Sequence, residues 1–368
     1  MSPQRGVTNE PVVTPSRKKA FHPLTVADVE SLCDDAVAVT FDVPDDLNDE
    51  FHFRPGQSLM LSRMVDGVEH RRSYSICAPV GERPRVGVRE VTDGLFSSWL
   101  VHEVKAGDRI DAQGPSGSFY ADPSAGGRHV LIAAGSGITP MLSIAGSLLT
   151  NPGAEVVLLY GNRRSRPVMF AEEIADLKDQ YGARFDVVHV LSREPREVEL
   201  FSGRLDADRL RAILDTVVPT PDIDHFWLCG PFGMVNDAQS VLSELGVPKS
   251  SIHHELFYVD DVPPPQEKHH EPGVTGPSSE VTIVLDGRTV TGTLPQDESI
   301  LDAGEQLRSD LPSAGKGGVC GTCRAKVTVG DVDMRRNYAL EDSEVDAGFV
   351  RTCQTFPVSD TVTVDFDA

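Results

Sequence analysis

Three cysteines near the C-terminal end have the spacing of metal ligands. Cys320, Cys323 and Cys353 form a C-x2-C-x29-C pattern, and the Gly-rich stretch Lys316–Val319 leads into it. Thiolates spaced C-x4-C-x2-C, with a fourth far along the chain, hold a [2Fe-2S] cluster. Counting back from Cys320 places the first of these ligands at Gly315. The spacing therefore predicts an electron carrier that lacks one thiolate, rather than the zinc site or redox dithiol that C-x2-C alone indicates.

Gly315 leaves three hypotheses open. In the first, water, hydroxide or the hydroxyl of Ser313 fills the vacant ligand position, which gives a labile cluster of altered potential because ligand identity sets the potential. In the second, Gly315 abolishes the cluster. In the third, the chain is an engineered or chance variant of a four-cysteine parent. Iron and sulfide analysis separates a retained cluster from a lost one.

Glycine-rich turns form a second chemical signal. Residues 135–140, Gly-Ser-Gly-Ile-Thr-Pro, follow an apolar run and precede a helical pattern. Glycines there let the backbone approach a pyrophosphate, and the helix N-terminus adds partial positive charge. A plain strand-to-helix turn is the alternative. Residues 229–234, Cys-Gly-Pro-Phe-Gly-Met, strengthen the nucleotide interpretation, although Cys229 at a strand end also suits a buried core thiol.

A third signal is the tetrapeptide Arg72-Ser73-Tyr74-Ser75. On a strand, Arg72 and Tyr74 face one way while Ser73 and Ser75 face the other. Alone, this pattern is typical of a half-exposed strand. Three further segments accompany it: 54–57 (Arg-Pro-Gly-Gln), 94–97 (Gly-Leu-Phe-Ser) and 114–119 (Gly-Pro-Ser-Gly-Ser-Phe).

Composition excludes several classes of protein. The chain has 368 residues, 39% of them hydrophobic and 24% charged, without an apolar run long enough to cross a bilayer. The net charge of -22 disfavours nucleic acid and anionic membrane surfaces as partners. Six cysteines, three at ligand spacing, indicate a reducing compartment. We therefore expect a cytoplasmic, soluble protein of two or three domains.

The elements that position these residues follow three patterns. Residues 21–125 contain short alternating strands broken by Gly and Pro turns, which predict an antiparallel β-barrel. Residues 126–258 alternate strands and helices, which predict a doubly wound parallel sheet. A disordered leader (1–20) and a Pro- and Gly-rich linker (259–279) flank these two parts. Residues 280–368 begin with a hairpin signal at Asp286-Gly287 and a helix near Ser299, which predict an α+β module.

The first two parts resemble the ferredoxin-NADP reductase superfamily through the segments quoted above. The resemblance implies that Arg72 meets flavin phosphate, that Tyr74 stacks on the isoalloxazine and that Ser75, with Ser73 beside it, lies near flavin N5. The turn from Gly94 to Ser97 then binds the pyrophosphate, which favours FAD over FMN. The resemblance assigns the nicotinamide nucleotide to Gly135, Gly137, Thr139, Cys229, Gly230 and Pro231. We name these parts the flavin module (21–125) and the dinucleotide module (126–258).

The choice between NADH and NADPH depends on the ends of the next strands. An acidic residue there binds the ribose 2′-OH of NADH, whereas arginine binds the 2′-phosphate of NADPH. Arg163 follows the second strand of the dinucleotide module, and Ser192 and Arg193 follow the third. These residues predict NADPH, with NADH as the alternative. Glu255, at the end of the module, is a weak candidate for a residue close to the flavin.

Residues 280–368, the ferredoxin module, resemble plant-type ferredoxin, and this implies a β-grasp-like fold with Cys320, Cys323 and Cys353 as cluster ligands. The module order resembles that of oxygenase reductases. Segments 70–77, 133–141 and 337–340 favour the family of phenylacetyl-CoA epoxidase reductases, with ketosteroid hydroxylase reductases or other Rieske-type systems as the alternative. The implied partner is an oxygenase component that accepts electrons. No catalytic acid or base is nominated, because hydride transfer between cofactors needs none.

Two other functions remain open. If Gly315 abolishes the cluster, the chain is a flavin-only NADPH oxidase, or a member of an oxygenase complex that passes no electrons. The visible spectrum and the rate of cytochrome c reduction distinguish these alternatives from the reductase.

Overall fold

The computed structural model describes most of the chain. The described residues are 20–91, 94–166, 168–258, 276–285, 287–308, 311–313, 316–319, 321–338, 340 and 342–368. Most of the predicted leader and linker lie outside these ranges, as do Gly315 and Cys320, so the statements about them stay predictions. Within the described ranges, no helix has both the length and the apolar character that crossing a membrane requires.

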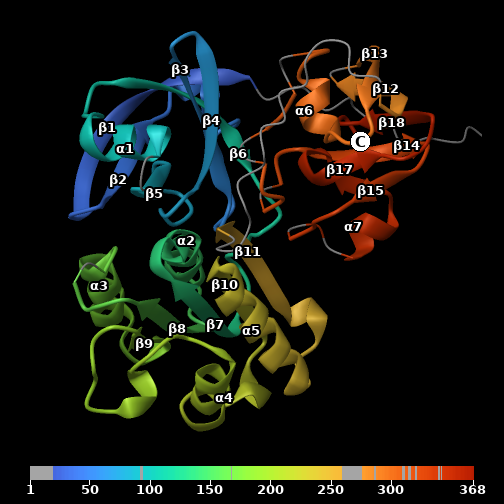
Figure 1. Ribbon diagram of the computed structural model, residues 1–368. Helices are drawn as coiled ribbons and strands as arrows, with labels where there is room; N and C mark the ends of the chain where they lie inside the picture. The colour runs from blue at the N-terminus through green and yellow to red at the C-terminus, as the bar shows by residue number, and fades with distance from the viewer. Residues whose placement is uncertain are drawn as a thin grey trace, which may run out of the picture.

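The flavin module is an antiparallel sheet that closes into a barrel (Figure 1). Its strand order is β4-β3-β6-β1-β2-β5, and a bridge between Ile76 and Val86 joins the two edge strands. Along β6, Ile110 and Ala112 are buried while Arg109 and Asp111 are exposed, the alternation of a half-buried strand. The elements are β1 (Phe21–Cys33), β2 (Ala36–Asp42), β3 (Ser58–Val65), β4 (Val68–Ser75), β5 (Arg85–Arg89), α1 (Leu95–His102) and β6 (Arg109–Ser116).

The dinucleotide module is a parallel sheet of order β11-β10-β7-β8-β9 with helices on both faces. Alternate residues of β7 enter two different cores: Leu131 packs with α2 and α3, whereas Val130 and Ile132 pack with α4 and α5. This confirms the predicted doubly wound fold. The elements are β7 (Gly127–Ala134), α2 (Ile138–Leu148), β8 (Ala154–Asn162), α3 (Ala171–Tyr181), β9 (Phe185–Leu191), α4 (Ala207–Thr216), β10 (His225–Pro231), α5 (Phe232–Glu244) and β11 (Ile252–Tyr258).

The flavin and dinucleotide modules share a continuous core. Cys77 of the first module belongs to the same apolar cluster as Leu131 and the buried residues of α2. The Ser143 hydroxyl donates to the Ala78 carbonyl at 2.6 Å, and the Val80 amide donates to Ser147 Oγ at 2.9 Å. These contacts hold α2 directly against the barrel.

The ferredoxin module is a mixed sheet of order β13-β12-β18-β14-β16 with a second, two-stranded sheet of β15 and β17. The predicted hairpin forms, with Leu285 paired to Arg288. The predicted helix also forms, and Ser299 Oγ caps it by accepting from the Asp302 amide at 3.2 Å. The elements are β12 (Ser278–Leu285), β13 (Arg288–Pro295), α6 (Ile300–Gly304), β14 (Arg324–Val329), β15 (Val332–Met334), α7 (Asp342–Asp346), β16 (Phe349–Arg351), β17 (Thr355–Pro357) and β18 (Thr361–Asp365).

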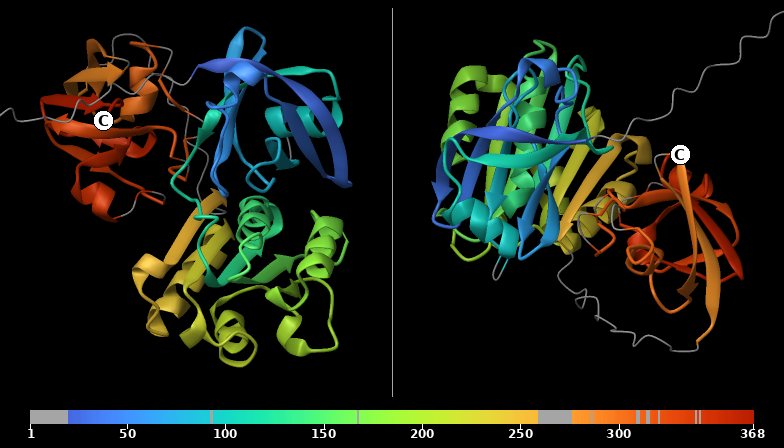
Figure 2. Two further views of the ribbon diagram at one scale, coloured as in Figure 1. Left: turned by 180° about the vertical axis from the view of Figure 1, so that it is seen from behind. Right: turned by 90° about the horizontal axis from the view of Figure 1, so that it is seen from above.

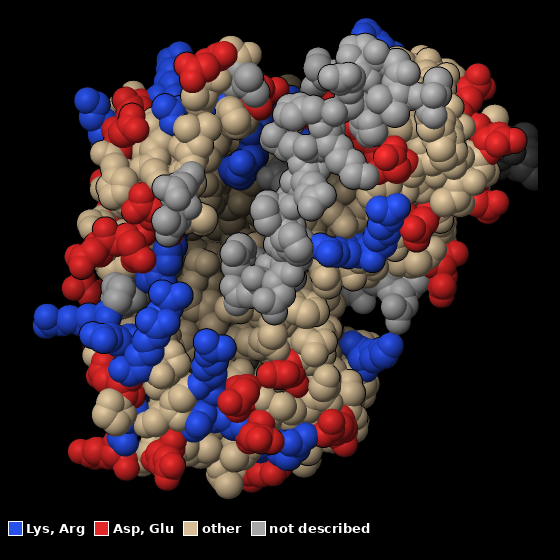
Figure 3. Space-filling view, in the orientation of Figure 1, with Lys and Arg blue, Asp and Glu red and all other residues tan. Residues whose placement is uncertain are grey.

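The ferredoxin module lies beside the other two modules, as both views of Figure 2 show. β12 begins at Ser278, two residues inside the segment predicted to be linker, because Ser278 and Ser279 already pair with Pro295 and Leu294. Figure 3 shows a hollow between the flavin and dinucleotide modules, with lysine and arginine side chains gathered around its rim. A basic rim favours the approach of an anionic ligand.

Candidate electron-transfer site

β4 presents the predicted flavin residues in alternation. Ser73 Oγ donates to Ser58 Oγ on β3 at 2.8 Å, and Ser75 is buried, whereas Arg72 is exposed. The half-buried Tyr74 ring lies 6.0 Å from the Phe96 ring of α1, and burial raises the pKa of its phenol. Tyr74 is therefore a neutral aromatic surface beside an exposed arginine, a combination that suits a flavin ring and its phosphate.

The turn before α1 has the shape of a phosphate cradle. Ser97 Oγ accepts from the Val91 amide at 3.1 Å and donates to the Gly94 carbonyl at 3.3 Å. A Cβ atom on Gly94 would lie 2.5 Å from Ser97 Oγ and 2.8 Å from the Val91 carbonyl, so only glycine fits. The turn leads directly into the N-terminus of α1, the end of a helix that favours an anion.

The Gly-rich turn after β7 meets the end of β10. A Cβ atom on Gly137 would lie 2.2 Å from the Cys229 carbonyl, so this glycine permits close approach of the two segments. Gly135 has φ 56°, and its carbonyl accepts from the Tyr160 hydroxyl at 3.0 Å. Thr139 is buried, and its hydroxyl donates to the Ser136 carbonyl at 3.0 Å. These three contacts fix the shape of the turn.

Three predicted residues meet where the flavin and dinucleotide modules join. β10 and β11 pair in parallel with Cys229 opposite Glu255 and Gly230 opposite Leu256. Ser75 Oγ donates to Glu255 Oε2 at 3.2 Å across the module boundary. Desolvation raises the pKa of the Glu255 carboxyl to about 7, and desolvation followed by the charge of Glu255 raises the pKa of Cys229. Cys229 is thus a neutral, buried thiol, and Glu255 is poised between protonation states near neutral pH.

The strand ends predicted to bind a 2′-phosphate lie next to each other. The Ser192 amide donates to the Asn162 carbonyl at 2.9 Å, and the Arg193 amide donates to the Arg163 carbonyl at 2.7 Å. Arg163 and Arg193 are both exposed. The structure brings together two guanidinium-bearing residues at the carboxyl edge of the sheet, where nucleotides bind in this type of fold.

Sequence reasoning missed Glu194 and Arg89. Glu194 Oε2 accepts from the Ser165 amide at 2.8 Å and from the Ser165 hydroxyl at 2.9 Å. An acidic side chain therefore lies among the arginine-rich segments that follow β8 and β9. Arg89, on β5, places Nη1 3.7 Å from the position a Cβ atom on Gly135 would take. The sequence offered one indication that Arg89 belongs to the site: it lies five positions before Gly94, on a predicted barrel strand. Arg89 also forms an ion pair with Asp35 at 3.3 Å.

The described cluster ligands lie together. Cys323 and Cys353 are buried and form no disulfide, and the hydrogen bond from Cys353 lowers the pKa of Cys323. The Thr352 hydroxyl donates to the Cys323 carbonyl at 3.0 Å, which ties the two segments. Arg351 is buried beside them, and its charge also lowers the pKa of Cys323. A thiol of lowered pKa beside a second buried cysteine and a buried cation fits an anionic iron–sulfur cluster. Cys320, the third predicted ligand, lies outside the described residues.

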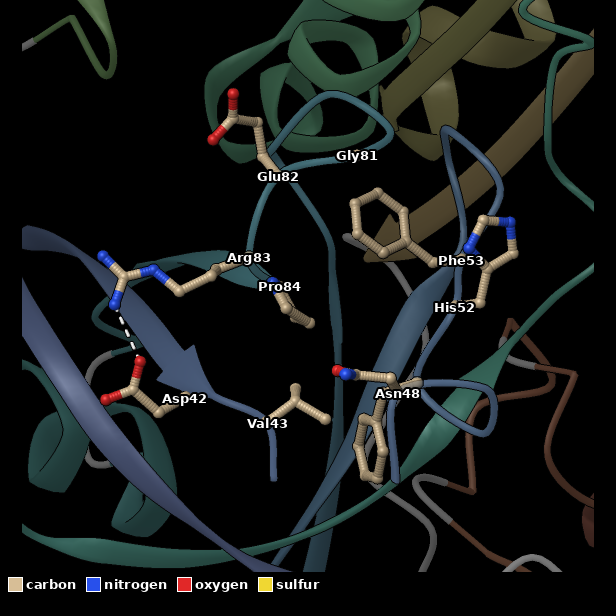
Figure 4. Close-up of a pocket in the computed structure, with 10 residues that line it drawn as sticks. Asp42, Val43, Asn48, His52, Phe53, Gly81, Glu82, Arg83 and Pro84 are labelled. Carbon is tan, nitrogen blue, oxygen red and sulfur yellow. Dashed lines mark hydrogen bonds and ion pairs between the residues drawn. The ribbon is translucent and has the colours of Figure 1, made fainter. Parts of the chain in front are cut away.

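The cavity in Figure 4 lies apart from this site. Its volume is about 320 Å³, and an Arg83–Asp42 ion pair of 2.7 Å closes one side. A second cavity of about 410 Å³ opens between the barrel and α3. Neither is lined by a residue assigned to flavin, nucleotide or cluster.

Family models match the three modules in order. Residues 23–120 match an oxidoreductase FAD-binding domain, residues 131–240 an oxidoreductase NAD-binding domain and residues 283–358 a 2Fe-2S iron-sulfur cluster binding domain. The cofactor set predicted from the sequence, FAD, NAD(P)H and a [2Fe-2S] cluster, is the set that these domains bind.

Relatives share the whole arrangement. One component of 1,2-phenylacetyl-CoA epoxidase from Escherichia coli (strain K12) is 42% identical over 354 residues, which cover 95% of this chain and 98% of the relative. The chain belongs to this family of reductases. Another member, the ferredoxin reductase component of 3-ketosteroid-9-alpha-monooxygenase from Rhodococcus rhodochrous, is 33% identical over 353 residues, covering 93% of this chain and 96% of that one. Family membership makes the chain an NAD(P)H-dependent oxidoreductase, the reductase component of an electron-transfer system.

Solved structures show the same fold. Phthalate dioxygenase reductase aligns with a TM-score of 0.59 at 21% identity, covering 96% of this chain and 100% of that one. An intact type IV self-sufficient cytochrome P450 monooxygenase aligns with a TM-score of 0.67 at 21% identity, over 97% of this chain and 43% of that one. The predicted multidomain fold is confirmed.

Proposed function

We propose that this chain passes electrons from NADPH, through FAD and a [2Fe-2S] cluster, to the oxygenase component of a phenylacetyl-CoA epoxidase. The observation that carries the electron path is the meeting of Ser75, Glu255 and Cys229 at the boundary between the flavin and dinucleotide modules. A flavin held by β4 and a nicotinamide held at Cys229 then face each other. The 42% identity to a component of 1,2-phenylacetyl-CoA epoxidase supports the choice of oxygenase.

The chain's own residues hold and orient the cofactors. Tyr74 supplies an aromatic surface for the isoalloxazine, and Ser75 and Glu255 supply polar groups at its edge. Gly94 and Ser97 shape the turn that receives the pyrophosphate. Bound FAD accepts a hydride and releases electrons one at a time, which an oxygenase metal centre requires. The protein contributes placement and the exclusion of water.

The nucleotide preference rests on Arg163 and Arg193, whose adjacent, exposed positions let both pair with a 2′-phosphate. Glu194 is held by Ser165 and so leaves these guanidinium groups available. Steady-state kinetics with both nucleotides test this preference. A higher kcat/KM for NADH than for NADPH contradicts it.

The cluster is retained at the position marked by Cys320, Cys323 and Cys353, with a non-thiolate ligand in place of the first cysteine. Ser313 is the protein hydroxyl nearest in sequence, and its Oγ donates to Glu305 Oε1 at 3.4 Å. Gly315 itself has no side chain with which to bind iron.

A reconstituted electron-transfer assay tests the whole proposal. The protein is loaded anaerobically with FAD, iron and sulfide and combined with a phenylacetyl-CoA epoxidase core, and NADPH oxidation is measured with and without phenylacetyl-CoA. We expect substrate-dependent oxidation and cluster absorbance beyond the flavin band, both lost in Cys323→Ser. A ketosteroid hydroxylase oxygenase serves as the alternative acceptor. Flavin absorbance alone with slow cytochrome c reduction supports the flavin-only oxidase instead, and protein that binds no flavin supports the complex member that passes no electrons.

A further inference from the structure

One aromatic contact joins the ferredoxin module to the dinucleotide module. The Tyr338 and Phe232 rings meet edge-to-face, with centroids 5.0 Å apart and planes at 67°. Both side chains are half-buried, and Tyr338 and Val319 pack against the apolar core of the dinucleotide module. Edge-to-face rings at this distance attract each other as well as exclude water.

On the ferredoxin side, the contact is attached to the cysteine loop. The Tyr338 amide donates to the Gly318 carbonyl at 3.3 Å, and Val319 directly precedes Cys320. Asn337 fixes the segment, because its Oδ1 accepts from the Leu340 amide at 2.8 Å and its Nδ2 donates to the Leu340 carbonyl at 3.0 Å. These two hydrogen bonds tie Asn337 to Leu340, on either side of Tyr338 in the chain.

On the dinucleotide side, the contact is attached to the proposed nicotinamide turn. Phe232 is the first residue of α5 and follows Pro231, three positions after Cys229. Met234 and Val235 are buried and hold the start of this helix against the sheet. The Phe232 ring therefore lies at a fixed point close to the site of hydride transfer.

We propose that Phe232 and Tyr338 are positioning residues that dock the cysteine loop against the dinucleotide module and set the rate of electron transfer from flavin to cluster. This inference rests on the proposed function. Bound FAD would take up a hydride from NADPH and a proton, and on reoxidation it would release two protons and give up two electrons one at a time. A cluster held by the cysteine loop would accept each electron in turn, one ferric ion becoming ferrous, and would pass it to the oxygenase. Such transfers depend on how closely the two cofactors are held.

Two measurements on the full chain loaded with FAD, iron and sulfide test this role. Small-angle X-ray scattering reports docking and does not depend on the cluster, and anaerobic stopped-flow absorbance separates flavin reduction from cluster reduction. Tyr338→Ala and Phe232→Ala are the test variants, and Tyr338→Phe is the conservative variant. Phe356→Ala is the matched control, because Phe356 packs under Arg335 on the same module. Circular dichroism confirms that each variant folds.

We expect Tyr338→Ala and Phe232→Ala to increase the radius of gyration, and Tyr338→Ala to slow cluster reduction at least tenfold while flavin reduction by NADPH stays within twofold of wild type. Tyr338→Phe and Phe356→Ala stay at the wild-type values. An unchanged radius of gyration in both alanine variants overturns the proposal, as does unchanged cluster reduction in a Tyr338→Ala protein that carries a cluster. If the wild-type protein carries no cluster, the proposed function is contradicted. A larger radius of gyration in the alanine variants still supports docking of the cysteine loop against the dinucleotide module.

Discussion

The Ser75 hydroxyl and the Glu255 carboxylate form a hydrogen bond of 3.2 Å between residues 180 positions apart in the chain. The bond links the end of a barrel strand to the last strand of the parallel sheet. Because it lies at the proposed meeting point of flavin and nicotinamide, it fixes the relative position of the two modules at the reacting atoms.

Ser75→Ala removes this link. We expect flavin reduction by NADPH to slow by about 10- to 100-fold, because orientation of the two rings is lost while nucleotide binding is retained. Anaerobic stopped-flow absorbance in the band of the oxidised flavin measures the rate. Ser62→Ala is the control, since the Ser62 hydroxyl donates to Glu69 Oε1 within the barrel and lies outside the assigned flavin residues. Equal rates for the two variants contradict the prediction.

Glu255→Gln changes the dependence of stability on pH. The folded pKa, about 7, lies above the unfolded value of 4.5, so the folded state binds more protons between these values and stability falls as pH rises through this window. We expect the glutamine variant to lack this fall, which amounts to about 1 to 3 kcal/mol. Urea unfolding of flavin-free protein at pH 5 and pH 8 measures the difference. Parallel curves for variant and wild type contradict it.

His253→Phe changes stability in acid. His253 stacks on Trp227 at 4.1 Å and meets His225 at 3.2 Å, and burial lowers its pKa from 6.5 to about 4. The unfolded chain therefore binds the proton first, and stability is lost as pH falls from about 6.5 to about 4. We expect the variant to lose about 1 to 2 kcal/mol less than wild type over that window. Thermal unfolding measures this, with the exposed His52→Phe as control.

Gly315→Cys supplies the fourth thiolate. We expect about two irons per chain to survive gel filtration in air, whereas wild type loses a large share of its iron, because four thiolates hold the two irons more firmly than three. Iron and sulfide analysis with low-temperature EPR measures the difference. Gly317→Cys is the control, since a Cβ there meets no neighbouring atom but the spacing is wrong. Equal iron retention in wild type and Gly315→Cys contradicts the prediction.

Arg351→Met tests the buried cation beside the cluster ligands. Arg351 is 1% exposed, and removing its charge makes the surroundings of Cys323 and Cys353 less favourable to the reduced, more negative cluster. We expect the midpoint potential to fall by on the order of 50 mV. Arg324→Met is the control, because Arg324 pairs with Arg351 in the sheet yet binds Glu344 near the surface. A potentiometric titration followed by EPR gives both values.

Sequence periodicity and local turn chemistry predicted those features of the structure that depend on residues close together in the sequence. The hairpin that pairs Leu285 with Arg288, the helix that begins near Ser299 and the alternation of Arg72 to Ser75 follow from a few adjacent side chains. The fold class was predictable for the same reason.

Contacts between distant segments could not be predicted in this way. The His225–His253 contact depends on the register of β10 against β11, and Glu194 reaches Ser165 only because β8 and β9 are adjacent. Arg351 is buried, whereas a charged arginine is ordinarily expected at the surface, so the sequence did not predict its burial. The Phe232–Tyr338 contact depends on how two modules pack.

The order of strands in the ferredoxin module has a consequence for its biosynthesis. β18 follows the cysteines in the chain, yet it lies at the centre of the sheet, between β12 and β14, and it pairs in parallel with β12. The cysteines are therefore translated before the strand that completes their scaffold. Until β18 has been translated, the pairs β13-β12 and β14-β16 are not joined into one sheet, so we expect iron and sulfur to be inserted stably only after this strand has left the ribosome.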